Sequence, residues 1–121
     1  MESGEQSGSA ALAGLAPDAL APTFAALGDP TRLKLVTVLC DGAAHSISDL
    51  TGVADISRQG VTKHLNVLAA AGIVRGLKVG RESLWQLEGR KIDEAQQTLA
   101  SIGREWEQAL GRFKRFVEKD D

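Results

Sequence analysis

The sequence has little of what stabilises secreted or membrane-embedded proteins. It contains one cysteine, Cys40, which cannot form an internal disulfide bond. No apolar run approaches the roughly 20 residues that a membrane-spanning helix needs. The first residues also lack the basic segment and apolar core of a secretory signal. We therefore expect a protein of the reducing cytoplasm without a membrane-spanning segment.

Catalytic and metal-binding residues are equally scarce. The 121 residues include two histidines, and they contain no Ser/His/acid set, no Cys/His set and no glycine-rich phosphate loop. These absences argue against an enzyme and against a resident cofactor. A chain of this length fits one domain with a single modest core.

The most informative segment is ISRQGVTKHLNVL, from Ile56 to Leu68. Val61, Leu65 and Leu68 have the spacing of one helical stripe. The residues on the opposite side are Arg58, Gln59, Thr62, Lys63 and Asn66. Ser57 is a good N-cap, and Ile56 can pack as a hydrophobic staple. Polar side chains and free N–H groups at such a helix start suit phosphates and base edges, although a solvated amphipathic helix without a ligand is the alternative.

Charge is unevenly distributed along the chain. Between Ile56 and Arg81 there is no acidic residue, so this segment has a net charge of +5. The whole chain has a net charge of −2, and the remainder is therefore −7. The basic residues are Arg58, Lys63, Arg75, Lys78 and Arg81. A local basic surface on an acidic body is typical of a DNA-binding module.

Two short helices are expected after a tail. Residues 1–16 are rich in Ser, Gly and Glu, which predicts a disordered tail before one domain over residues 17–121. Pro22 fits the first turn of a helix that ends at Leu27, with Phe24 and Leu27 pointing inward. Asp29-Pro30 is typical of a second helix start. The buried stripe of this second helix is predicted to be Leu33, Val36, Leu39 and Cys40.

A helix-turn-helix and a wing are expected next. Ser46 and Asp49 have the spacing of a capping box for a short third helix that ends at Gly52. This helix, a tight turn and the Ile56–Leu68 helix together predict a helix-turn-helix. Gly72 is a suitable left-handed C-cap residue. The β-prone runs IVRGLKV and SLWQL then predict a hairpin, or wing, with Gly80-Arg81 at or near its tip.

A long last helix is expected over about residues 90–118. Its apolar seam comprises Ile92, Leu99, Trp106, Leu110, Phe113 and Val117. This seam is too apolar for an outer helix, and Gly103 would permit close approach of a second helix. We therefore predict a dimer interface on this helix. The alternative is a seam packed entirely within its own domain.

In combination, four segments resemble the ArsR/SmtB family of bacterial winged-helix repressors. They are GDPTRLKL, SRQxVTKHLxVL, AGIV and the GRE wing, and the resemblance covers about Phe24 to Val117. It implies a mainly α fold with a small β-hairpin: four helices, the hairpin and a fifth helix. It also implies a homodimer joined through the first and last helices, bound to a palindromic operator. The expected interface residues are Phe24, Leu99, Trp106, Leu110 and Phe113.

The resemblance implies a sequence-specific transcriptional repressor that binds double-stranded DNA. Each recognition helix would occupy a major groove, and each wing would contact the flanking backbone or minor groove. The predicted contacts are Ser57, Arg58, Gln59, Thr62, Lys63, Lys78 and Arg81. Gln59 and Thr62 should read base edges, and Arg58 should contact either a base or a phosphate. The residues that should mostly contact phosphates are Ser57, Lys63 and Arg81. The alternative is a winged-helix protein-interaction module without operator binding, which would have no reason to keep the basic segment.

The metal ligands of the family's sensors are largely missing. Their Cys-x-Cys falls on Ser46-Ile47-Ser48, and a neutral hydroxyl is a poor ligand for a soft metal. The four ligands of their last-helix zinc site fall on Asp93, Ala95, Trp106 and Ala109. We therefore expect no metal site. An unidentified small-molecule effector, or none, is compatible with these residues.

Three further residues invite sharper hypotheses. Cys40 has no second cysteine to pair with, and at the end of an apolar stripe it is expected to be a small buried hydrophobe. His64 lies beside the apolar stripe of its helix and is expected to be a partly buried, hydrogen-bonded ring. His45 lies near the third helix without an evident ligand set.

Overall fold

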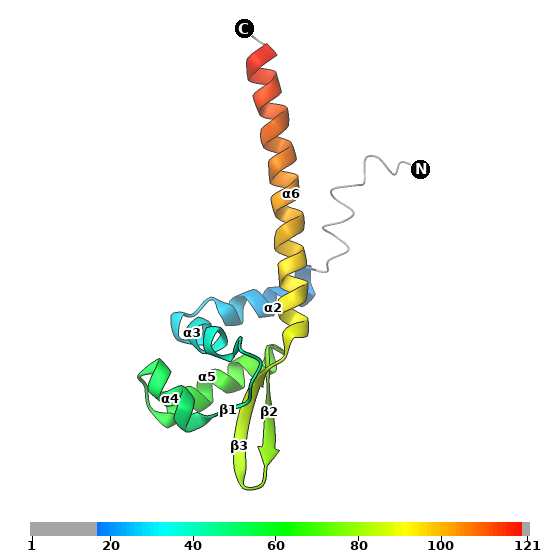
Figure 1. The fold of residues 1–121 in the computed structure, drawn as a ribbon. Coiled ribbons are helices and arrows are strands. Elements are labelled where there is room, and N and C mark those ends of the chain that lie inside the picture. The colour runs from blue at the N-terminus through cyan, green and yellow to red at the C-terminus, as the bar shows by residue number, and fades with distance from the viewer. Residues whose placement is uncertain (1–16, 120–121) are drawn as a thin grey trace.

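The computed structural model describes residues 17–119, and one long helix projects from a body of shorter elements (Figure 1). In chain order the elements are α2 (Pro17–Leu27), α3 (Pro30–Leu39), β1 (His45–Ser46), α4 (Ile47–Ala54), α5 (Arg58–Ala70), β2 (Val74–Val79), β3 (Glu82–Leu87) and α6 (Gly89–Lys119). This is the predicted winged helix-turn-helix, with one additional strand. The tail predicted over residues 1–16 lies outside the described residues. Within residues 17–119 no helix has the length and apolarity needed to cross a membrane.

Helix α2 begins earlier than expected. It starts at Pro17, where a missing N–H costs nothing, and Pro22 lies inside the helix rather than in its first turn. The buried residues are Leu20, Thr23 and Ala26. The prediction that Phe24 and Leu27 point inward was therefore wrong for Phe24, which is half-buried at the edge of this face. Leu27 is also half-buried, but it packs against the core.

Helix α3 has the predicted start but a different buried face. The Asp29 side chain accepts a hydrogen bond from the Arg32 backbone N–H at 3.0 Å, and Pro30 follows at the first helical position. The buried residues are Leu35, Val36 and Leu39. The prediction was wrong for Leu33 and Cys40, which are both exposed. The core-facing stripe is centred near Leu35, about 200° around the helix from Leu33, and Cys40 follows the last helical residue.

The cap on α3 makes one pH-dependent prediction. The Arg32 backbone N–H holds the pKa of Asp29 below its ordinary value of 3.8, against the opposing effect of desolvation. The ionised cap therefore stabilises the fold above pH 3.8, and this stabilisation is lost as pH falls through the lower folded pKa. We expect Asp29→Asn, which keeps a capping oxygen but cannot ionise, to flatten the pH dependence of the urea midpoint over this range. An unchanged pH profile would contradict a contribution from this carboxylate.

Both helices of the helix-turn-helix have the predicted N-caps. The Ser46 Oγ accepts from the Asp49 backbone N–H at 3.1 Å, and the Ser57 Oγ accepts from the Gly60 backbone N–H at 3.0 Å. These hydroxyls satisfy donors that a helix start leaves unpaired. The caps mark where α4 and α5 begin.

The ends of the two helices differ in how well local signals predicted them. Helix α4 continues through Gly52, its predicted end, because Asp55 adopts the left-handed conformation at φ 57° and ends the helix there. A short polar side chain such as aspartate tolerates this region. Helix α5 ends as expected before Gly72, which has a positive φ of 79°.

The wing belongs to a three-stranded sheet in the order β1-β3-β2. The prediction of two strands was therefore incomplete, because β1 has only two residues and shows no alternation. His45 of β1 lies opposite Trp85 of β3, and Gly76 of β2 lies opposite Trp85 on the other side. The Trp85 side chain packs against the core, so the sheet attaches the wing to the helices.

The tip of the wing is the predicted two-residue turn. Val79 pairs with Glu82, which leaves Gly80 and Arg81 as the loop. Gly80 has a φ of 63°, a conformation that glycine adopts without steric cost. Arg81 therefore stands at the tip of the paired hairpin.

The core lies behind the recognition helix. Its fully buried large side chains are Leu35, Leu39, Leu50, Val61, Leu65, Leu68 and Ile73. The predicted apolar stripe of α5 is confirmed, since all three of its residues are completely buried. Helix α5 is consequently held in place along its whole inner face.

Helix α6 leaves the body after its first turns (Figure 1). Ala95 and Ser101 are buried in its lower part, which α2 contacts, and Ile92 packs partly against the core. Its exposed large apolar residues are Leu99, Ile102, Trp106, Leu110, Phe113, Phe116 and Val117. The alternative of a seam packed within its own domain therefore fails from Leu99 onward. The seam is also wider than predicted, because it includes Ile102 and Phe116.

Candidate nucleic-acid interface

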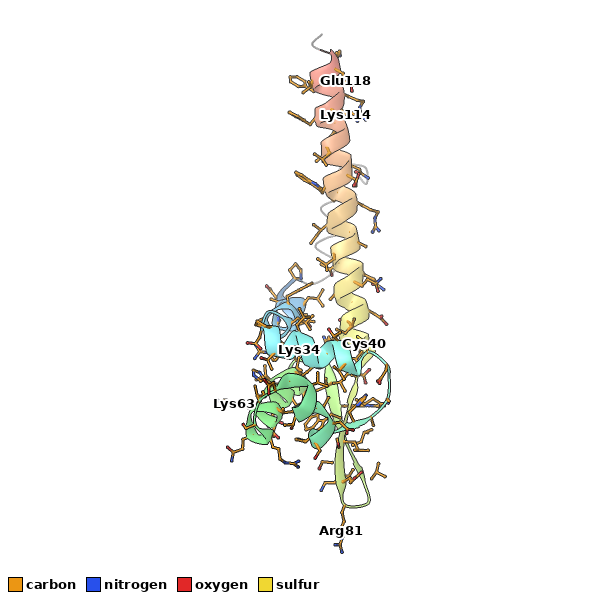
Figure 2. The ribbon with its side chains drawn as sticks, turned by 60° about the vertical axis from the view of Figure 1, so that its left-hand side comes forward. Lys34, Cys40, Lys63, Arg81, Lys114 and Glu118 are labelled. Atoms are coloured by element: carbon orange, nitrogen blue, oxygen red, sulfur yellow. The ribbon has the colours of Figure 1, made fainter. Side chains whose placement is uncertain are left out.

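The outer face of α5 carries the predicted contact residues. The exposed ones are Ser57, Arg58, Gln59 and Lys63, and Thr62 is half-buried beside them. Lys63 lies on the outer side of the body, at the end of the molecule away from the tip of α6 (Figure 2). The structure thus brings these five residues together on one accessible surface.

The wing adds a second basic element. Figure 2 shows Arg81 pointing away from the body at the tip of the wing. Lys78 is exposed on β2. Arg75 differs, since its side chain lies 4.0 Å from Glu88 and donates to the Gln86 side chain at 3.2 Å. Arg75, which is not among the predicted contacts, is therefore engaged with its neighbours at the sheet.

Four cations of this surface have no acidic partner among residues 17–119. They are Arg58, Lys63, Lys78 and Arg81, and none of them forms an ion pair with another described residue. Exposed basic side chains that no carboxylate of the described chain neutralises leave their charge available to an anionic ligand. The α5 face and the wing together form a basic surface that is compatible with the DNA backbone.

Arg58 has a polar contact that no sequence pattern predicted. Its Nη1 donates to the Ser48 Oγ of α4 at 2.7 Å. The two residues come from different helices of the helix-turn-helix, so no helical spacing links them. This bond draws the guanidinium toward α4 and away from the centre of the α5 face.

His64 is held from behind by α3. The Arg32 Nη1 lies 3.3 Å from the His64 Nδ1, and the Arg32 Nε donates to the Ala26 carbonyl oxygen at 2.7 Å. Arginine cannot accept, so Nδ1 acts as the acceptor in this contact. The prediction of a partly buried, hydrogen-bonded ring is confirmed. Arg32 thereby connects the end of α2 to the recognition helix, a role that its place in the DPTR segment did not reveal.

The donor atoms at the two family metal positions do not fit a metal. The Ser46 Oγ accepts from a backbone N–H and the Ser48 Oγ accepts from Arg58, and both are neutral hydroxyls. On α6, Ala95, Trp106 and Ala109 offer no ligand atom beside Asp93. The His45 Nε2 already contacts both Asp41 oxygens, at 3.0 and 2.9 Å. Residues 17–119 contain no group of three or more His, Cys, Asp or Glu side chains that could hold a metal ion.

This chemistry predicts indifference to metals. Micromolar Zn²⁺, Cd²⁺ or As(III) should change DNA affinity by no more than about a factor of two, below the ~1 kcal/mol of a meaningful allosteric coupling. Titrations of labelled duplex DNA with and without each metal measure this directly. Reproducible release by any of the three would reveal a site that includes His45, His64 or Cys40.

The comparisons with known proteins agree with this geometry. A family model described as a helix-turn-helix domain matches residues 27–76. An ArsR-like transcriptional regulator from Rhodococcus sp. RHA1 is 41% identical, with a TM-score of 0.69, over 82% of this chain and 92% of that one. The crystal structure of another ArsR family transcriptional regulator is 30% identical, with a TM-score of 0.66, over 75% of this chain and 93% of that one.

A curated relative gives the same assignment. The HTH-type transcriptional repressor SmtB of Mycobacterium tuberculosis is 33% identical over 70 residues, which are 58% of this chain and 51% of that protein. This match spans about half the length of the curated relative. The relatives are named as transcriptional regulators and not as enzymes. The chain therefore belongs to the ArsR/SmtB family of helix-turn-helix proteins, and it is a DNA-binding transcriptional regulator.

Proposed function

We propose that this chain is a cytoplasmic repressor that binds a palindromic operator as a homodimer. One α5 helix would enter the major groove at each half-site, and the wing beside it would contact the flanking backbone or minor groove. Two half-sites are needed because a twofold-symmetric dimer presents two identical surfaces. Repression would follow from occupancy of the operator.

The observation that carries the proposal is the unpaired basic surface on α5 and the wing. Arg58, Lys63, Lys78 and Arg81 form no ion pair within residues 17–119, although the chain as a whole is acidic. An interaction module without nucleic acid would have no reason to keep these charges together and unpaired. The pattern favours DNA over an acidic protein partner because the positive side chains follow a helix and a hairpin of groove-binding dimensions.

Within this surface we divide the contacts by chemistry. Gln59 and Thr62 would read base edges, because amides and hydroxyls can donate and accept hydrogen bonds. Ser57, Lys63 and Arg81 would contact phosphates, which orient the protein without reading sequence. Lys78 would add attraction along the wing. These assignments predict different kinds of defect for different substitutions.

The exposed seam of α6 supports a homodimer. Trp106 is 61% exposed and Phe113 is 65% exposed on the single chain, and both belong to α6. Aromatic side chains contribute a large apolar area, and a continuous exposed stripe of them marks an interaction site. We propose that a second copy covers Leu99, Trp106, Leu110 and Phe113, with Phe24 of α2 at the edge.

Selection of bound fragments from a random DNA pool tests this function. The purified protein should enrich an inverted repeat whose half-sites are about one helical turn, or a multiple of it, apart. Enrichment of single, unpaired half-sites would contradict the palindrome, and no enrichment above input would favour the interaction module. The recovered sequence also supplies the duplex used in the experiments below.

A further inference from the structure

A hollow lies between the helix-turn-helix and the tip of the wing. Its volume is about 400 Å³. The polar side chains that line it are Ser46, Ser48, Arg58, Arg81, Glu82 and Ser83. They come from β1, α4, α5 and the hairpin, so the hollow forms only when the wing is folded against the helices. Two of the proposed DNA contacts, Arg58 and Arg81, are part of its lining.

We propose that this hollow is a seat for one phosphate of the DNA backbone, with Ser48 as a binding residue. The inference rests on the proposed function, which places α5 and the wing on the same duplex. A phosphate offers anionic oxygens that accept from guanidinium and hydroxyl groups, and arginine presents several N–H donors in one plane. Two guanidinium groups and three hydroxyls line the hollow, so its donors match this ligand class.

The Arg58–Ser48 contact assigns Arg58 to this phosphate rather than to a base. The Ser48 Oγ accepts from the Arg58 Nη1 at 2.7 Å, which holds the guanidinium at the hollow and leaves its other N–H groups free. Because the Ser48 oxygen is the acceptor, its own O–H remains able to donate to a phosphate oxygen. A side chain held in position loses little conformational freedom when it binds.

The lining of the hollow has a net positive charge, which one carboxylate reduces. Arg58 and Arg81 contribute two positive charges and Glu82 contributes one negative charge, so the lining carries a net +1. Neither arginine forms an ion pair with another residue of the described chain. The negative charge of Glu82 would repel a bound phosphate and so lower the affinity of the seat. Removing this carboxylate should therefore strengthen binding to DNA of any sequence.

An exchange of two neighbouring residues tests the seat without changing net charge. Ser48→Asp combined with Asp49→Ser moves one carboxylate by a single position. The carboxylate then takes the place of the Ser48 hydroxyl that contacts Arg58. An acid remains in the first turn of α4, which favours helix stability. The Asp49 backbone N–H, which the Ser46 cap uses, is retained by serine. Thermal unfolding monitored by circular dichroism checks that the exchanged protein folds.

Binding is measured by fluorescence anisotropy on two duplexes, one of mixed sequence and one recovered from the random pool. The exchange should weaken both by about tenfold or more and lower the salt slope by about one unit per protomer. Ser48→Ala should weaken both by about threefold, since Arg58 loses its anchor but gains no opposing charge. Glu82→Gln should tighten both by about threefold.

The outcomes separate the seat from the proposed function. Wild-type protein that binds neither duplex would overturn the proposed function itself. Wild-type binding that the exchange and Ser48→Ala leave unchanged would overturn the seat alone. A loss confined to the selected duplex would also overturn it, because Arg58 would then be reading a base. If the exchanged protein does not fold, Ser48→Ala and Glu82→Gln test the seat instead. Ser48→Ala should weaken DNA binding and Glu82→Gln should strengthen it, and unchanged affinities in both would overturn the seat.

Discussion

Leu110→Asp is expected to convert the protein to a monomer at micromolar concentration and to weaken operator binding by about 100-fold or more. Leu110 is 43% exposed on α6, within the stripe that includes Trp106 and Phe113. In a symmetric dimer each substitution occurs twice, so two carboxylates would lie in an apolar interface without partners. The loss of dimerisation free energy should exceed what the lost leucine contacts alone contribute, because the two carboxylates also lose their water. The apolar area buried in the dimer contributes several kcal/mol at about 25 cal/mol per Å².

The effect on DNA binding follows from geometry rather than from contact. Leu110 lies on α6 about one helical turn before Lys114, and Figure 2 shows Lys114 far from Lys63 on α5 and from Arg81 on the wing. Leu110 is therefore not expected to touch the half-site that α5 and the wing contact. A monomer contacts one half-site and loses the effective concentration that the second subunit supplies. Affinity for an isolated half-site should therefore remain close to that of the wild-type subunit.

Gln108→Asp supplies the matched control. Gln108 is exposed on α6 about 200° around the helix from Leu110. Its substitution by aspartate therefore adds the same charge on the opposite side of the helix. Analytical ultracentrifugation gives the oligomeric state of each variant, and operator titrations give the affinity. A Leu110→Asp protein that stays dimeric would place the interface elsewhere. A folded monomer with full operator affinity would remove the dimer from the mechanism.

The parts of the fold that depend on local chemistry could be predicted from the sequence. Ser46 and Ser57 cap helices through bonds to backbone groups three residues away. Gly72 and Gly80 mark positive φ values that other residues seldom adopt. Each of these signals acts within a few residues, so the order of elements and the position of the wing tip followed directly.

Features that depend on distant partners could not be predicted in the same way. Leu33 and Cys40 are exposed because α3 turns its Leu35 face toward the core, and this choice depends on how α3 packs against α4 and α5. The pairing of His45 with Trp85 joins residues far apart in the chain. In the candidate interface, the outward residues of α5 followed from helical periodicity. Ser48 did not, since its contact with Arg58 depends on the angle between two helices.

The second large effect concerns base recognition. Gln59→Ala should cost ~1–3 kcal/mol on the selected operator and relax preference at one position of each half-site. Gln59 is exposed in the first turn of α5, and its amide can donate and accept toward a base edge. Removing it leaves the base with unsatisfied groups in a contact from which water is partly excluded. Binding to mixed-sequence DNA, where this contact is not matched, should change little.

Lys63→Ala and Arg81→Ala should behave differently, because a phosphate contact carries no sequence information. Each should weaken the selected and mixed duplexes by the same factor and lower the salt slope by about one unit per protomer. Both side chains are exposed and neither forms an ion pair in the chain from 17 to 119, so their removal leaves no unpaired acidic partner. The folded structure should be unaffected.

The ratio of affinities for the two duplexes, measured over a range of salt concentrations, distinguishes these roles. Gln59→Ala should lower the ratio and leave the salt slope unchanged, whereas Lys63→Ala and Arg81→Ala should leave the ratio unchanged and lower the slope. Three variants that lose selectivity equally would refute the division between base and phosphate contacts. If Lys63→Ala alone lowers the ratio, the reading surface extends further along α5 than Gln59 and Thr62, because Lys63 lies one turn beyond Gln59 on the same exposed face.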